Sequence, residues 1–233
     1  LPTSRCDAVC PRKDRGALRS FGGTPRCSFT LSAAHGAVAT GNGSESTTFI
    51  SEYKRAKNEA LPMSQRWAAL QKATSLASGE EFLKIVAFSD SKDWFMRNAS
   101  LVALEKSGSD MVYDQAKKLI TDKALVVRSA AADILMKLNN DAVKKIFSAE
   151  LEKKYNFNGK NSLWIRKQMM SHLVKNPQVS ERDFYVRYLY DQDTEIAVLS
   201  TKALEKITQI RFTAANDKDL VNQWKKVARQ EKW

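Results

Sequence analysis

The sequence predicts an all-α protein in which about five pairs of helices follow one another and a single helix closes the C-terminal end. Three observations lead to this prediction. From residue 48 onward apolar residues recur with helical spacing, and no alternating strand pattern appears. In the same region an arginine returns in a similar apolar context at a near-constant interval. Glycine and proline, which interrupt helices, gather instead before residue 48.

Residues 1–47 differ in composition from the rest of the chain. They hold all three cysteines, six of the nine glycines and three of the five prolines, and they show neither a helical nor a strand period. A segment this poor in large apolar side chains cannot bury enough surface to offset the entropy of ordering it. We therefore expect 1–47 to be a disordered or leader-like segment and 48–233 to form the folded domain.

Three other interpretations of the first segment stay open. Phe29–Ala39 ends in a small-x-small pattern, as a targeting segment does, although it has few strong hydrophobes. Cys6, Cys10 and Cys27 could begin a metal site, but a fourth ligand is missing. The segment could also reflect the choice of start site, because the first methionine is Met63.

Five anchor positions define the repeat. Four carry arginine and the fifth carries alanine: Arg66, Arg97, Arg128, Arg166 and Ala197. They are separated by 31, 31, 38 and 31 residues. The long interval contains the run 155–161, whose Asn, Gly and Lys composition predicts a loop inserted between two helices.

Each interval accommodates two helices. In the second unit an apolar stripe over 82–88 is followed by the polar break 90–93, and Asp93 is a candidate N-cap for the next helix. We expect that helix to run to about Lys106, where Gly108 helps to stop it. The third and fifth units repeat this plan of an apolar stripe, an aspartate-containing break and an alanine-rich helix.

The third unit carries a resemblance to a known family. Asp122, Val127 and Arg128, followed by Ala130 and Ala131, resemble HEAT repeats of the short bacterial kind that also occurs in phycobilin lyases. The resemblance covers about four-fifths of the chain. It implies a right-handed α–α superhelix, or α-solenoid, in which pairs stack because one pair cannot bury its apolar faces alone. It implies little about function, because this armadillo-like architecture mostly provides surfaces.

The recurrent arginines allow two interpretations. In a structural ladder each arginine pairs with an aspartate of an adjacent turn, with Asp90, Asp93 and Asp122 as candidates, and connects one repeat to the next. In a functional row the same groups bind an anion. The resemblance favours the structural ladder, whose members are Arg66, Arg97, Arg128 and Arg166. The fifth unit, with Ala197, lacks this contact.

A second register consists of lysines. Nine residues after four of the anchors stand Lys106, Lys137, Lys175 and Lys206. They are expected near the C-terminal ends of successive second helices, which line the concave face in solenoids of this kind. This concave basic row is the candidate ligand-binding site. The alternative is that each lysine only stabilises a helix C-terminus, by about 0.3–1 kcal/mol.

The positive net charge adds polyanions to the candidate partners. The chain has 38 Lys+Arg against 26 Asp+Glu, a net charge of +12. A basic surface attracts polyanions in a salt-dependent way, so nucleic acid is a candidate partner beside an acidic protein. Trp94 and Trp164 lie just before their anchors and could stack on bases if exposed, although aromatics at such spacing usually pack inside. The longest uncharged stretch, Cys27–Ser44, is mostly small and polar, so we expect no transmembrane segment.

The sequence offers little that indicates an enzyme. It has no phosphate-binding glycine loop, no HExxH and no GxSxG motif. His35 and His172 are too isolated to form a metal site, and His172 is expected to be a packed or surface residue, so we expect neither metal nor cofactor. Asp93, Trp94 and Arg97 have the residue types that HEAT-like alkylpurine DNA glycosylases use. However, Asp93 also suits a cap and Arg97 the ladder.

These observations favour a non-catalytic scaffold, expected to be a monomer, that binds a protein partner through the concave face of a HEAT-type solenoid. The alternative is a nucleic-acid-binding HEAT protein, including an alkylpurine DNA glycosylase of that fold. The absence of cysteine after residue 47 is compatible with a cytoplasmic protein and with an exported, periplasmic one.

Overall fold

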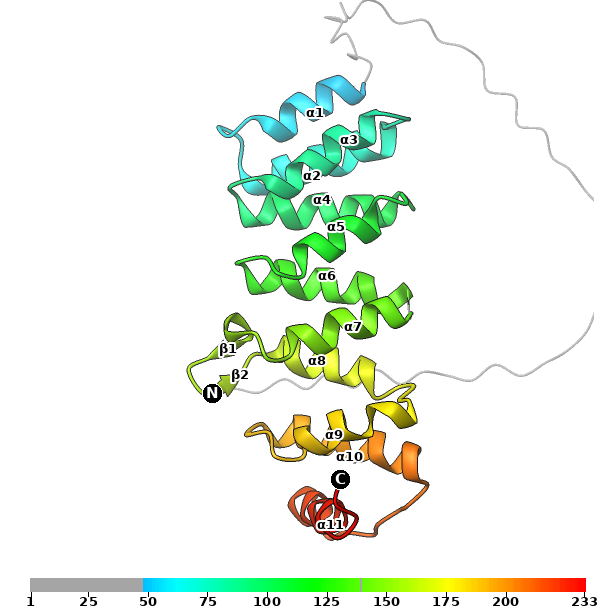
Figure 1. Ribbon diagram of the computed structural model, residues 1–233. Helices are drawn as coiled ribbons and strands as arrows, with labels where there is room; N and C mark the ends of the chain where they lie inside the picture. Colours follow the sequence, from blue (N-terminus) through cyan, green and yellow to red (C-terminus); the bar gives the residue numbers. More distant parts are fainter. Residues whose placement is uncertain (1–47, 139) are drawn as a thin grey trace, which may run out of the picture. The chain divides into compact units, whose positions relative to one another are not determined.

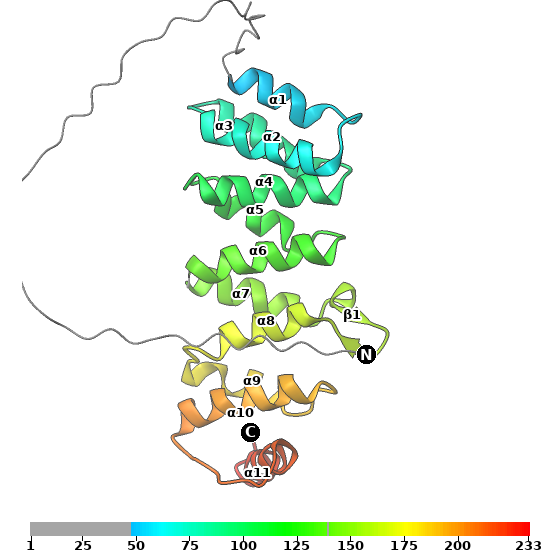
Figure 2. The same ribbon diagram turned by 180° about the vertical axis from the view of Figure 1, so that it is seen from behind.

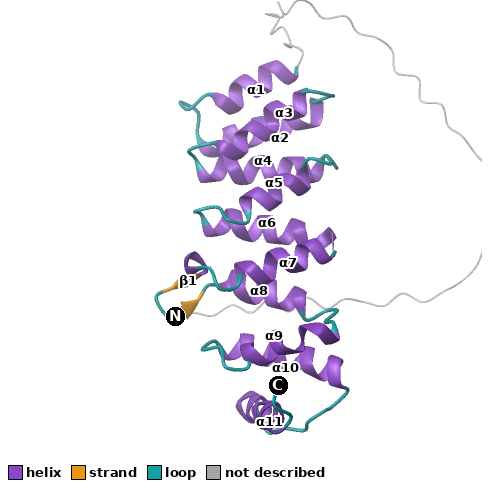
Figure 3. Ribbon diagram, in the orientation of Figure 1, coloured by secondary structure: helices purple, strands orange, loops and turns teal. Residues whose placement is uncertain are grey.

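The computed structural model describes residues 48–138 and 140–233. The targeting, metal-site and disorder expectations for residues 1–47 therefore lie outside the described residues. All of the described elements belong to one compact unit. They are almost entirely helical, which confirms the prediction of an all-α fold (Figure 3).

Eleven α-helices occur in the described ranges and follow one another in chain order (Figure 1). They are α1 (Phe49–Lys57), α2 (Met63–Leu76), α3 (Glu81–Val86), α4 (Trp94–Lys106), α5 (Val112–Leu119), α6 (Leu125–Leu138), α7 (Asp141–Glu150), α8 (Trp164–Leu173), α9 (Arg182–Tyr188), α10 (Thr194–Thr208) and α11 (Asp217–Gln230). Three short 3₁₀ helices accompany them: η1 (Ala87–Asp90), η2 (Lys154–Asn156) and η3 (Val179–Glu181).

The helices pack in pairs, and the second helices of successive pairs form one continuous row. Contacts join α1 to α2, α3 to α4, α5 to α6, α7 to α8 and α9 to α10, and α11 packs on α10. The second helix of each pair also contacts the second helix of the next, so α2, α4, α6, α8 and α10 form the row. Figure 2 shows the same helices from behind, again in chain order.

Local signals explain where several helices begin and end. Thr48 and Ser51 form a reciprocal capping box at the start of α1. Asn216 accepts a hydrogen bond from the Asp219 amide at the start of α11 (2.9 Å). After α4 the chain turns at Gly108, whose φ of 68° favours glycine, where the sequence predicts a stop.

The insertion in the long interval is more ordered than predicted. Two short antiparallel strands, β1 (Phe157–Asn158) and β2 (Asn161–Ser162), form a hairpin between α7 and α8. The expectations of a plain loop, and of no strand after residue 48, are therefore wrong. Two-residue strands are too short to show an alternating pattern. The Phe157 ring packs on the buried guanidinium of Arg166, 4.3 Å from ring centre to Cζ, and this contact holds the hairpin against α8.

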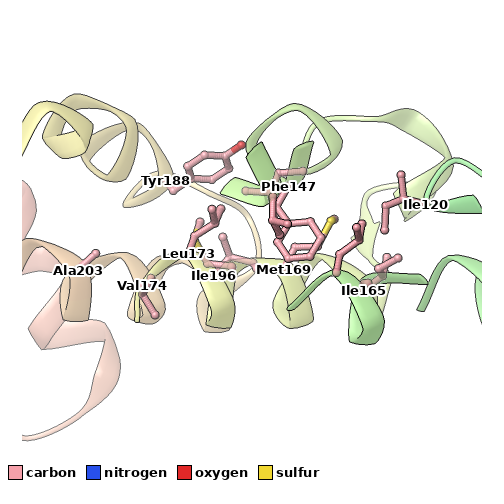
Figure 4. Close-up of a cluster of buried hydrophobic side chains, with 14 of the residues drawn as sticks. Ile120, Phe147, Ile165, Met169, Leu173, Val174, Tyr188, Ile196 and Ala203 are labelled. Atoms are coloured by element: carbon pink, nitrogen blue, oxygen red, sulfur yellow. The ribbon is translucent and has the colours of Figure 1, made fainter. Parts of the chain in front are cut away.

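Two buried apolar clusters hold the pairs together. One contains residues of α1 to α4, including Leu70, Ile85 and Met96, which are fully buried. The other runs from α4 to α11. Figure 4 shows part of this second cluster, with Phe147 of α7 lying against Met169 of α8. Each second helix buries some of its side chains in these clusters and leaves others exposed.

Candidate binding face of the second helices

The solvent side of the second helices is lined by residues in a regular register. On α6 the exposed positions include Val126, Asp133 and Lys137; Trp164 is exposed at the start of α8, and Lys175 is exposed just after its end. Spacings of seven and four residues place such positions on one side of a helix. The row of second helices therefore presents one continuous face, which we call the second-helix face.

One edge of this face is apolar. Large side chains stand at the first or second residue of four consecutive second helices. They are 45–55% exposed: Met63 52%, Trp94 45%, Val126 45% and Trp164 55%. We call them the apolar row. Of the two alternatives for the tryptophans, the structure therefore has the exposed one and not packing inside the core. Met63 and Val126 had no role in the sequence analysis, although they precede their anchors by the same two or three residues as the tryptophans.

Trp164 is fixed in place by its polar atom. Its indole Nε1 donates to Ser129 Oγ on α6 (3.2 Å), and that hydroxyl donates to Gln168 Oε1 (2.9 Å). Gln168 in turn donates to Asp133 Oδ1 (2.6 Å). Since the indole N–H already has an acceptor, the exposed part of Trp164 is apolar carbon, which is the usual character of an interface anchor.

The lysine row lies at the other end of the same helices. Lys106, Lys137, Lys175 and Lys206 are all exposed. Eleven residues separate Val126 from Lys137 within α6. At a rise of about 1.5 Å per residue this places the two rows roughly 16 Å apart.

Three of the four lysines reach back to the preceding second helix. Lys106 Nζ donates to Gln71 Oε1 (3.1 Å), and Lys137 forms an ion pair with Glu105. Lys206 Nζ donates to the carbonyls of Val174 (2.9 Å) and Lys175 (2.8 Å), at the end of α8. The last contact is the stabilisation of a helix C-terminus that the sequence analysis named as the alternative.

The second-helix face carries both signs of charge along its whole width. Asp133 on α6 is exposed, and Glu195 on α10 pairs with Lys167 on α8 (2.6 Å). Glu105 lies beside Lys106 on α4 and forms an ion pair with Lys137. The second-helix face is therefore a mixed polar surface with an apolar edge rather than a uniformly positive track.

The anchor arginines lie under one end of this face and are buried. Arg66 Nη1 contacts Asp93 Oδ2 (2.8 Å), and Arg166 Nη2 contacts Asp191 Oδ2 (2.6 Å). Arg97 makes two bonds to Asp122, from Nε (2.6 Å) and from Nη2 (2.8 Å). Each pair connects one helix pair to the turn of the next, and Asp93 and Asp122 are two of the three expected partners.

Two details differ from the expectations for the ladder, while the fifth unit agrees with them. Asp90, the third candidate, pairs with Lys118 instead (2.5 Å). Asp93 occupies the N-cap position of α4, but its side chain makes no cap hydrogen bond, because it faces Arg66. At the fifth anchor, Ala197 is buried and makes no polar contact with its side chain.

Arg128 has no carboxylate partner in the described part of the chain, so the expectation of an aspartate there is wrong. Its Nε donates to Asn156 Oδ1 (3.0 Å), and Nη2 donates to the Tyr155 carbonyl (2.7 Å). Its Nη1 donates to the carbonyls of Asp122 (2.6 Å) and Lys123 (3.2 Å). The insertion places Asn156 where the other units place an aspartate, so neutral oxygens satisfy the guanidinium.

The protonation of these groups follows their surroundings. Burial acts to raise the pKa of Asp122, but hydrogen bonds from Arg97 and the Ala124 amide, with the charges of Arg97 and Arg128, lower it below its usual value. The hydrogen bond to Asp122 raises the pKa of Arg97, whereas burial lowers that of Arg128. The Arg97–Asp122 pair is therefore fully ionised near neutral pH.

Two candidate catalytic features are occupied in this way. The Asp93 carboxylate is bonded to Arg66, and the Arg97 guanidinium is bonded to Asp122 and to the carbonyls of Ser91 and Lys92.

His172 is buried, lies edge-on to Phe147 (5.4 Å between ring centres), and neither ring nitrogen has a hydrogen-bond partner among the described residues. Burial and the nearby lysines Lys175 and Lys144 lower its pKa.

Searches for related proteins and sites add no assignment. Comparison with protein-family models finds no match, and comparison with curated proteins finds no relative. In 48–138 and 140–233 no three His, Cys, Asp or Glu side chains gather as metal ligands would. None of the helices in these ranges has the length and apolar character that crossing a bilayer requires.

Proposed function

We propose that residues 48–233 form a HEAT-type α-solenoid that acts as a non-catalytic scaffold and binds a protein partner on the second-helix face. The stacking of five helix pairs on a shared row of second helices supports the architecture. The observation that carries the function is the apolar row. Four large, half-exposed side chains at the first or second residue of successive second helices form the kind of surface that protein partners cover.

The lysine contacts favour a protein over a polyanion. A phosphate backbone binds where cations are available in a continuous series. Lys137 is paired with Glu105, and Lys206 is bonded to helix carbonyls. Asp133 lies between the two rows, and Glu195 stands on α10 in the register of Val126 and Trp164. Alternating charges around apolar anchors suit the polar rim of a protein interface better. We propose a monomer with one such face.

A nucleic-acid partner remains the second candidate. Trp94 and Trp164 are both exposed on the second-helix face and offer rings for base stacking. From residue 48 onward 32 basic residues oppose 23 acidic ones, a net charge of +9. The occupied Asp93 and Arg97 give no support to the glycosylase form of this candidate.

Quantitative affinity capture with matched variants tests the protein-binding proposal. The double variant Trp94→Ser with Trp164→Ser removes the two largest members of the apolar row. The control, Leu83→Ser with Val179→Ser, removes side chains that are 56% and 73% exposed on α3 and η3. We expect specific partners to be lost only from the tryptophan variant, with both proteins keeping the helical circular dichroism of the unmodified chain. Equal capture by all three proteins would contradict the proposal.

Fluorescence anisotropy of labelled single- and double-stranded DNA across a salt series tests the second candidate on the full chain. We expect weak binding that Trp94→Ser with Trp164→Ser does not alter. Tight binding that falls steeply with salt and depends on these tryptophans would favour nucleic acid and call for a glycosylase assay.

A further inference from the structure

Arg66 differs from the other anchor arginines in its unused donor. In Arg97, Arg128 and Arg166 all three guanidinium nitrogens donate to an acceptor. Arg66 uses Nε, which donates to the Ala56 carbonyl (3.1 Å), and Nη1, which donates to Asp93. Its Nη2 has no acceptor in the described part of the chain, although Arg66 is only 6% exposed. Nη2 is not among the buried polar atoms that lack a partner, so it keeps access to solvent. An accessible guanidinium N–H without an acceptor is suited to an incoming oxyanion.

Arg66 also lines a hollow of about 210 Å³ between α1, α2 and the α3–η1 segment. Lys57 and Lys84 line it from α1 and α3, and Tyr53 and Phe88 form an aromatic wall, with 5.7 Å between the ring centres and the rings nearly perpendicular. None of the lining residues belongs to the apolar row or to the lysine row. This inference therefore stands apart from the proposed function.

The charges around the hollow leave cations in excess. Two carboxylates line it, but each is held by a lysine outside it: Glu59 by Lys92 (2.6 Å) and Asp90 by Lys118 (2.5 Å). Lys57 and Lys84 form no ion pair with a described residue.

Each of these two lysines lies over an aromatic ring, Lys57 over Tyr53 and Lys84 over Phe49, both at 5.6 Å from the ring centre. The hollow thus combines two ammonium groups, one unused guanidinium donor and an aromatic wall. A phosphate group offers several oxygens to donors arranged in this way, and a flat ring packs well against Tyr53 and Phe88.

We propose that this hollow binds a small organic phosphate whose oxyanion contacts Arg66, Lys57 and Lys84 and whose single ring packs against Tyr53 and Phe88. The volume suits one ring with one phosphate rather than a dinucleotide. Arg66 Nη2 supplies a directional hydrogen bond, and the two lysines supply charge at the opening.

Titration of the full-length protein with phenyl phosphate tests this site. The readout is the ¹⁵N NMR signal of the Arg66 Nε–H group, at about pH 7.5, where the phosphate is a dianion. We expect a saturable shift. The variant Lys57→Gln with Lys84→Gln should bind about tenfold more weakly, since it removes two partly exposed charge contacts.

The matched control is Lys54→Gln with Lys72→Gln, which removes the same charge from exposed positions of α1 and α2 outside the hollow. It should bind as the unmodified protein does. Inorganic phosphate tests the phosphate group alone, and phenol tests the ring alone. Each should bind more weakly than phenyl phosphate. The absence of a saturable shift, equal weakening in both double variants, or equal binding of either fragment would overturn the assignment.

Discussion

Arg97 and Asp122 form a buried two-point ion pair that joins α4 to the turn before α6. The nitrogens Nε and Nη2 lie 2.6 and 2.8 Å from the two carboxylate oxygens, and both side chains are 6% exposed. Parallel hydrogen bonds of this kind fix orientation as well as distance. The pair therefore sets how one helix pair sits on the next, and with it the shape of the second-helix face.

Removal of one partner of this pair should be costly. Asp122→Ala leaves the Arg97 guanidinium buried with only backbone acceptors, and we expect the free energy of unfolding to fall by about 3 kcal/mol. Glu195→Ala breaks the exposed Lys167–Glu195 pair and should change it by about 1 kcal/mol or less. Urea denaturation followed by circular dichroism measures both. Similar losses in the two variants would contradict a structural role for the buried pair.

The same pair should make stability fall at acid pH. The pKa of Asp122 is lower in the folded protein than in the unfolded chain, so the unfolded chain takes up the proton first. The contribution of this pair is therefore complete above about pH 4 and is lost as the pH falls through the lowered folded value. Denaturation of the unmodified protein and of Asp122→Ala at a series of pH values should show their difference in stability shrinking below pH 4. A constant difference would exclude this linkage.

Arg128 should matter more than the exposed lysine on the same helix. Arg128→Ala empties a site that is 2% exposed and leaves Asn156 Oδ1 and the Tyr155 carbonyl without their donor, so we expect a loss of about 3 kcal/mol. Lys137→Ala removes an exposed ion pair and should cost about 1 kcal/mol or less. Thermal and urea denaturation of the two variants make the comparison. Equal, small effects would refute a structural role for Arg128.

His172 should destabilise the protein at mildly acid pH. Burial first, then Lys175 and Lys144, hold its folded pKa below the ordinary value of about 6.5. Below that value the unfolded chain binds the proton more readily, so stability should fall as the pH drops from 7 to about 5. His172→Leu removes the titrating group and keeps an apolar side chain next to Phe147. The variant should lose less stability over this range, and parallel pH profiles would contradict the assignment.

Much of the fold follows from local patterns. Helical spacing of apolar residues predicts the all-α fold, and Gly108 marks the end of α4 at Lys106 as expected. The recurrence of arginine and aspartate also predicts the kind of contact that Arg66 makes with Asp93. These features depend on residues close in sequence or on a regular repeat, and both can be recognised without knowing any distance in space.

Other features depend on neighbours that no local pattern identifies. The hairpin forms where Phe157 meets Arg166, and Arg128 takes neutral oxygens because the insertion brings Asn156 to it. Three of the four lysines in the row contact the preceding second helix, although their spacing alone indicates an open basic stripe. In each case the partner lies on a different element, so only the folded chain decides which atoms are satisfied.

The sequence by itself determined the helical content, the period of the repeat and the positions of its buried arginines. Each of these features follows from the spacing of side chains along the chain. Only the tertiary structure decided that Trp94 and Trp164 are exposed, that three of the four lysines contact the preceding helix and that Arg66 keeps an unused nitrogen beside a hollow. Exposure and hydrogen-bond saturation are set by the packing of separate helices against one another, and the spacing within one helix does not contain that information.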